Sequence, residues 1–138
     1  MFIKDDSGRF FDPAKASLIE VDKDDTGPIR NYRVKYPGGR SIRVKCNHEE
    51  LMWALSVVVS AAPDTKAERV TFFRVDCEGQ VQYSGILDGV FTVIAWRFRP
   101  DMPNKPEPVL LLEHGALGRE NHKKEDFDRY CFEVVDKQ

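Results

Sequence analysis

The sequence predicts an α+β protein, in which a mostly antiparallel bent sheet or half-open barrel of seven to eight strands carries one packed helix (about 48–62). Alternating apolar and polar residues recur along most of the chain, and turn residues separate the alternating segments. A single long apolar segment begins with a helix-capping residue. Because the chain has 138 residues, a single domain over residues 1–138 is expected.

The N-terminal region is predicted to contain short strands. Residues 2–4 and 9–11 flank a small turn at residues 6–8. Residues 18–23 alternate apolar and charged side chains and form the next strand, and residues 24–28 are a loop by composition.

The segment between Thr26 and His48 is predicted to form a β-hairpin with one apolar face and one basic face. Tyr32 and Val34 alternate with cations in the first strand, and Val44 does so in the second. The segment contains no Asp or Glu. Its six cations are Arg30, Arg33, Lys35, Arg40, Arg43 and Lys45.

The same alternation restricts the register of this hairpin. Val34 and Val44 share the apolar face only if the loop has an odd number of residues, three or five. The cation pairs are then Lys35 with Arg43 and Arg33 with Lys45. Because like charges directly opposite each other in a sheet repel, an anionic group of the fold or of a partner must balance them.

A helix is expected over about 48–62. Asn47 can cap it, Glu50 has the spacing of a capping box, and Pro63 marks its end. The three valines at 57–59 are poor helix formers, so a strand is the alternative there. The cap and the length favour the helix.

The second half of the chain is predicted to be all-β. Asp88-Gly89 is a strong signal for a two-residue hairpin turn, and residues 78–79 form another turn. The proline-rich segment 100–108 is expected to be a loop or an edge crossing. Residues 115–126 are polar and are expected to form a mobile loop. The expected strands are 70–76, 81–87, 90–98, 109–113 and 130–135.

The net charge of −2 does not imply a global attraction to nucleic acid or to an anionic membrane. No apolar run approaches the roughly 18 residues that a membrane span needs, and no secretory signal is recognised at the N-terminus. The three cysteines, Cys46, Cys77 and Cys131, have no disulfide-framework spacing. A cytoplasmic protein without a membrane partner is therefore expected.

Two interpretations of the basic face remain open. In the first, Glu20 and Asp22 of the preceding strand neutralise Arg33 and Lys35. In the second, all six cations form an anion-binding surface for an acidic protein or for nucleic acid. The acidic protein partner is favoured over nucleic acid, because Tyr32 and the other hairpin tyrosine point to the apolar face and cannot stack on bases beside the cations.

The segment 51–59 is apolar on nearly all sides and must be covered on all sides. Either the second half of the chain covers it, or Trp53 and Val57 lie in an interface with another subunit or partner. The second interpretation predicts a homodimer.

No catalytic residues, metal ligands or cofactors are predicted. Cys46 and His48 are two residues apart, but no second ligand pair accompanies them at a spacing typical of zinc sites. If the protein is a small enzyme, its site is expected in the loop 113–126, which contains Glu113, His114, Arg119 and His122.

The sequence therefore favours a non-enzymatic binding protein of the inhibitor or adaptor type, which uses the cationic hairpin face and the apolar helix. A nucleic-acid-binding protein that uses the same basic hairpin is the alternative, and the small enzyme is the third hypothesis.

Overall fold

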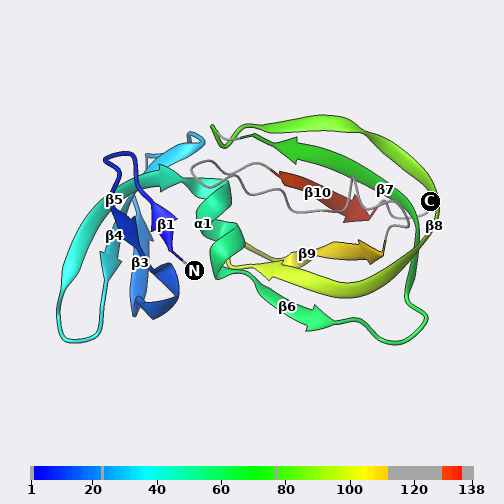
Figure 1. The fold of residues 1–138 in the computed structure, drawn as a ribbon, viewed down its shortest axis with the longest axis horizontal. Coiled ribbons are helices and arrows are strands. Elements are labelled where there is room, and N and C mark those ends of the chain that lie inside the picture. Colours follow the sequence, from blue (N-terminus) through cyan, green and yellow to red (C-terminus); the bar gives the residue numbers. More distant parts are fainter. Residues whose placement is uncertain (1, 23, 77, 112–128, 135–138) are drawn as a thin grey trace. The chain divides into compact units, whose positions relative to one another are not determined.

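The structure, a computed structural model, describes residues 2–22, 24–76, 78–111 and 129–134 (Figure 1). The chain divides into two compact units, Met1–Leu55 and Ser56–Gln138. Each unit has its own cluster of buried apolar residues. The single domain stays a prediction, because two compact units can belong to one domain or to two.

The first unit holds two small antiparallel sheets and one α-helix (Figure 1). β1 (Ile3–Lys4) pairs with β2 (Phe10–Phe11), and the 3-10 helix η1 (Pro13–Lys15) follows them. The second sheet has the order β3 (Leu18–Val21), β4 (Ile29–Lys35) and β5 (Ser41–Asn47). The helix α1 (His48–Leu55) begins directly after β5.

The alternation in β4 and β5 produces one buried and one exposed sheet face. Tyr32 and Val34 are buried, whereas Arg33 between them is exposed. The buried side chains join those of the other elements in one core. This core contains Ile3, Phe11, Tyr32, Val34, Val44, Cys46, Leu51 and Met52.

The β4–β5 hairpin confirms the odd loop length but not the predicted pairing. Residues 36–40 connect the strands, and Lys35 pairs with Ser41. Arg33 consequently lies opposite Arg43, two residues from the predicted register. Because side chains alternate with a period of two, this shift leaves the cations on the predicted face.

The predicted helix over about 48–62 is too long. Asn47 does cap α1, since its Oδ1 accepts the backbone N–H of Glu50 at 3.2 Å. The helix ends at Leu55, however, and Val57–Ser60 form the strand β6. The strand alternative is therefore correct for the valines, because their β-branched side chains favour an extended backbone and β8 offers them a pairing partner.

The second unit is one curled antiparallel sheet (Figure 1). It contains β6 (Val57–Ser60), β7 (Lys66–Val75), β8 (Val81–Arg99), β9 (Met102–Leu111) and β10 (Arg129–Val134). β7 and β6 pair with successive parts of one edge of β8, and β9 pairs with its other edge. β10 pairs with β7 and also approaches β9, so the sheet forms a half-open barrel.

The predicted hairpin turn at Asp88-Gly89 is wrong, because β8 runs through these residues without a turn. β7 pairs with β8 on both sides of these residues, from Val81 to Asp88 and from Phe91 to Thr92, and the register shifts between the two stretches. Arg69 of β7 lies opposite Asp88, with 3.5 Å between Arg69 Nε and Asp88 Oδ1. The other predicted turn, at residues 78–79, does connect β7 to β8, and Gly79 N–H donates to the Asp76 carbonyl there at 3.0 Å.

The proline-rich segment belongs to β9, which pairs only with β8 among the described residues. Of the two alternatives predicted for residues 100–108, the loop is therefore wrong, and the edge crossing agrees with the pairing of β9 on one side. The α+β class with one helix is confirmed, although the described residues form ten strands in three sheets. The loop 115–126 lies outside the described residues.

Candidate functional site

The exposed face of the β3–β5 sheet carries side chains in rows that cross the three strands. Pairing of β4 with both neighbours fixes the rows, and the backbone N–H of Asp22 extends them by donating to the Asn31 carbonyl at 3.3 Å. Read from β3 to β5, the rows are Glu20, Arg33, Arg43 and Asp22, Asn31, Lys45. The face therefore changes from acidic on β3 to basic on β5.

A groove of about 610 Å³ lies over this face. Three cations of the sheet line it, and we call Arg33, Arg43 and Lys45 the basic floor. The loop of residues 5–9 lines the groove beside β5. This loop is fixed to β5, since Asp6 N–H donates to the Lys45 carbonyl at 2.8 Å and Arg9 Nη2 donates to the Arg43 carbonyl at 2.6 Å.

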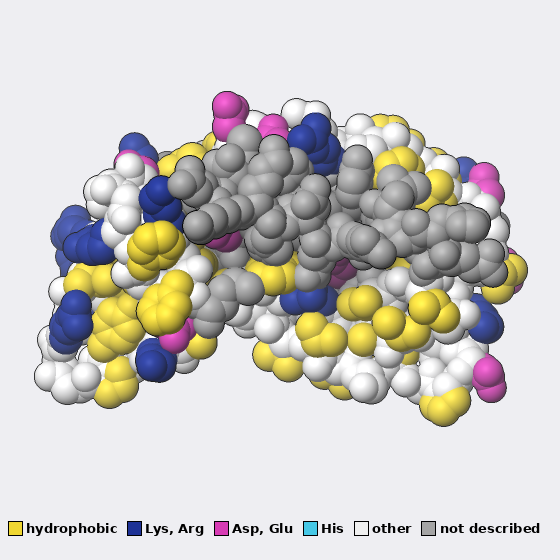
Figure 2. Space-filling model, in the orientation of Figure 1, with side chains coloured by type: hydrophobic (Ala, Val, Ile, Leu, Met, Phe, Trp, Pro, Cys, Tyr) yellow, Lys and Arg dark blue, Asp and Glu magenta, His cyan; other side chains and the backbone are white. Residues whose placement is uncertain are grey.

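Figure 2 shows several Lys and Arg side chains at the left of the view, where Figure 1 places β3, β4 and β5. Acidic residues line the groove together with the basic floor. On the β3 side they are Glu20 and Asp22, and on the loop side they are Asp5 and Asp6. The groove thus combines a basic floor with acidic residues on both sides.

Asp5 holds the loop 5–9 in shape. Its buried carboxylate accepts hydrogen bonds from Ser7 N and Oγ at 3.1 and 2.7 Å, and from Arg9 N and Nε at 2.9 and 3.2 Å. Burial of Asp5 acts to raise its pKa, but the hydrogen bonds from Ser7 and Arg9 outweigh burial and lower the pKa below its usual 3.8. Sequence reasoning missed this anchor, although Asp, Ser and Gly together typically mark such a turn.

Asp5→Asn is expected to weaken the fold at neutral pH and to reduce its sensitivity to acid. The pKa of Asp5 is lower in the folded state, so its stabilisation is complete above the unfolded value near 3.8 and is lost as the pH falls through the folded value. Urea unfolding at several pH values from neutral to acidic measures the effect. Asp24→Asn, an exposed position, is the control, and an unchanged pH profile in Asp5→Asn would contradict the assignment.

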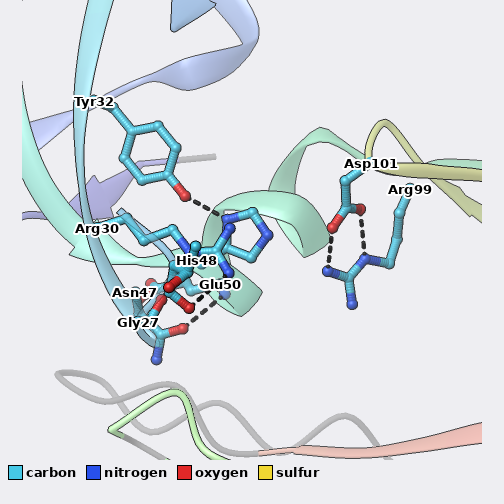
Figure 3. Close-up of polar contacts among 9 residues, drawn as sticks. Gly27, Arg30, Tyr32, Asn47, His48, Glu50, Arg99 and Asp101 are labelled. Atoms are coloured by element: carbon cyan, nitrogen blue, oxygen red, sulfur yellow. Dashed lines mark hydrogen bonds and ion pairs between the residues drawn. The ribbon is translucent and has the colours of Figure 1, made fainter. Parts of the chain in front are cut away.

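The structure brings together four of the six predicted cations. Arg33, Lys35, Arg43 and Lys45 share the exposed face. Arg30 lies elsewhere, because its guanidinium donates to the carbonyls of Gly27 and Thr26 in the preceding loop (Figure 3). Arg40 lies in the turn, 5.9 Å from the centroid of the Tyr36 ring.

In the part of the chain that the structure describes, an intramolecular ion pair neutralises one of these four cations. Lys35 Nζ lies 3.0 Å from Glu20 Oε1, and this hydrogen bond and ion pair lower the pKa of Glu20. Arg33 adds a weaker electrostatic effect on the same carboxylate. Among the described residues, no carboxylate lies within ion-pair distance of the basic floor.

The two predicted interface residues lie on different elements. Trp53 is half-buried on α1 of the first unit, whereas Val57 belongs to β6 of the second unit and is 61% exposed. They were grouped because the sequence predicted one helix over both. The helix ends between them, at Leu55.

His48 and Tyr32 form a buried polar pair that the sequence did not suggest. The Tyr32 hydroxyl is hydrogen-bonded to His48 Nδ1, and the two rings are nearly parallel, with an angle of 6° between their planes (Figure 3). His48 N–H also donates to the Pro28 carbonyl at 2.9 Å. These bonds connect the first turn of α1 to β4 and to the loop before it.

The environment of Cys46 disfavours its use as a nucleophile. The thiol is buried, and burial followed by the nearby carboxylates of Glu50, Asp5 and Asp6 raises its pKa to about 12. The reactive thiolate is therefore scarce at neutral pH. Within the described residues, no group of three or more His, Cys, Asp or Glu is arranged to hold a metal ion. The loop 113–126 lies outside those residues.

The described part of the chain also has no helix with the length and apolar character needed to cross a membrane. Comparison with known proteins finds no significant match to a family model, to a curated protein sequence or to a solved structure.

Proposed function

We propose that this chain is a non-enzymatic binding protein of the inhibitor or adaptor type, which docks an acidic segment of a protein partner on its basic floor. The pairing of Arg33 directly opposite Arg43 is the observation that carries the proposal. Two like charges in this arrangement destabilise a sheet, and a bound carboxylate would relieve their repulsion. Arginine suits this role, because its planar fork can bind a carboxylate through two hydrogen bonds.

The surroundings of the floor favour a protein segment over nucleic acid. Of the described residues that line the groove, Tyr32 alone is aromatic, and its side chain is buried, with the residue 4% exposed. Bases therefore find no aromatic surface for stacking beside the cations of the floor. Nucleic-acid binding through the same hairpin remains the alternative, and an electrophoretic mobility shift with duplex DNA at about 50 and 200 mM salt tests it.

Reversal of the floor charge is expected to abolish binding of an acidic peptide. The probe is a synthetic peptide with central glutamates and neutral glycine-serine flanks, titrated calorimetrically against the full chain at low salt. Arg33→Glu with Arg43→Glu should weaken binding by at least about tenfold, because two attractive pairs become repulsive. Arg40→Glu with Arg69→Glu makes the same charge change at two residues that do not line the groove and should leave the affinity nearly unchanged.

Thermal unfolding of both double variants verifies that they fold. An unchanged affinity in the folded Arg33→Glu, Arg43→Glu variant would refute the proposal. Tight DNA binding that is lost at the higher salt concentration would support the nucleic-acid alternative instead.

A homodimer and a cytoplasmic location are secondary proposals. Exposed Val57 and Val59, which share one face of β6, support an apolar contact with a second copy, since adjacent exposed apolar residues often mark interfaces. Trp53 supports a separate contact on the first unit. The free, buried Cys46 is compatible with a reducing compartment. A monomer mass by light scattering at micromolar concentration would contradict the dimer.

A further inference from the structure

We infer that the groove selects a short segment whose acidic centre is flanked by basic residues, and that it discriminates against extended polyanions. The inference rests on the proposed function and specifies the chemistry of the partner. Its basis is the arrangement of charge across the groove, where acidic residues lie on both sides of the basic floor.

The acidic side chains that matter are Asp22 beside β3 and Asp6 in the loop beside β5. Asp6 is fixed next to Lys45 by its backbone hydrogen bond, and Asp22 is fixed next to Asn31 in the same way. Glu20 and Asp5 contribute less, because their carboxylates bind Lys35 and Arg9. An anion on the floor therefore has negative charge on two sides of it.

This arrangement affects a polyanion and a mixed-charge segment differently. Negative groups on either side of a bound anion approach Asp6 or Asp22 and are repelled, whereas basic groups there are attracted. Like-charge contact of this kind is an effective way to reject the wrong partner. The groove volume of about 610 Å³ lies in the range of pockets that enclose short ligands, so a short segment fits it.

The decisive experiment compares three synthetic peptides that share a central run of glutamates. Their flanks are lysine, neutral glycine-serine or glutamate, and each peptide is titrated calorimetrically against the full chain. Affinity should follow the order lysine, neutral, glutamate flanks, with at least about tenfold between the first and the last. Asp6→Asn with Asp22→Asn should reduce this range several-fold.

The double Asn variant keeps the fixed geometry, because the described hydrogen bonds of both aspartates use backbone groups. Asp24→Asn with Asp64→Asn is the matched control, since it removes two exposed acids outside the groove and should preserve the flank preference. Thermal unfolding of each variant confirms that it folds.

The possible results separate the inference from the proposed function. If glutamate flanks bind as tightly as lysine flanks, or if the control variant changes the preference as much as Asp6→Asn with Asp22→Asn, the inference is overturned. The proposed function still holds in that case, provided that Arg33→Glu with Arg43→Glu abolishes binding of the neutral-flanked peptide. If none of the peptides binds, both are overturned.

Discussion

Leu51→Ala is expected to lower the free energy of unfolding of the first unit by about 2–5 kcal/mol. Leu51 is fully buried in α1, within the core that also contains Ile3 and Val34. Truncation removes apolar burial and leaves a cavity between the helix and the sheet. Urea unfolding followed by amide NMR signals from residues 2–22 and 24–55 measures the loss in this unit.

Leu18→Ala is the control for this prediction. It removes the same side-chain atoms from β3, where Leu18 is 48% exposed, and should cost less than about 1 kcal/mol. Equal effects of the two substitutions would show that Leu51 is not part of a tightly packed core.

Gly85→Ala is expected to destabilise the curled sheet by several kcal/mol. Gly85 has φ +149°, and a Cβ there would lie 3.0 Å from Cε1 and 3.4 Å from Cζ of Phe72. Phe72 lies opposite Gly85 in β7 and packs against the buried cluster of this sheet. The added methyl group must therefore displace a ring of the core or bend the strand, in addition to straining the backbone.

Gly89→Ala separates the cost of the contact with Phe72 from the cost of backbone strain. Gly89 lies in the same strand with φ +147°, but a Cβ there would make only an ordinary contact of 3.5 Å with Phe91. Both substitutions strain the backbone similarly, so Gly85→Ala should cost about 1–3 kcal/mol more in chemical unfolding. A difference close to zero would mean that the Phe72 ring moves aside at little cost.

Patterns of neighbouring residues correctly predicted the features of the fold that depend on neighbouring residues, namely the two faces of a strand and the start of a helix. Alternation identified the two faces of β4 and β5, because side-chain direction depends on residue parity alone. Asn47 marked the start of α1, because a cap acts within one helical turn. The hairpin turn predicted at Asp88-Gly89 is wrong, because long-range pairing of β8 with β7 outweighs the local preference of these two residues for a turn.

The floor of the candidate site and its β3 side were predictable from the sequence, but its loop side was not. Arg33, Arg43 and Lys45 follow from alternation in the sequence. In the described part of the chain, the loop 5–9 joins the groove through Asp6 N–H and the Arg9 guanidinium, which donate to β5 carbonyls more than thirty residues later in the chain. The sequence gives no direct signal for such a contact, so Asp5 and Asp6 on the loop side of the groove were not anticipated, whereas Glu20 and Asp22 on the β3 side were expected beside the cations.

Because Arg33 lies opposite Arg43, stability and ligand binding place opposite demands on these two positions. A neutral side chain at either position would remove a repulsion and make the unbound protein more robust. The same substitution would remove one of the two arginines that are proposed to bind the acidic segment, and would weaken binding. Variants obtained by selecting only for heat resistance should therefore accumulate changes at these two positions and become poorer binders.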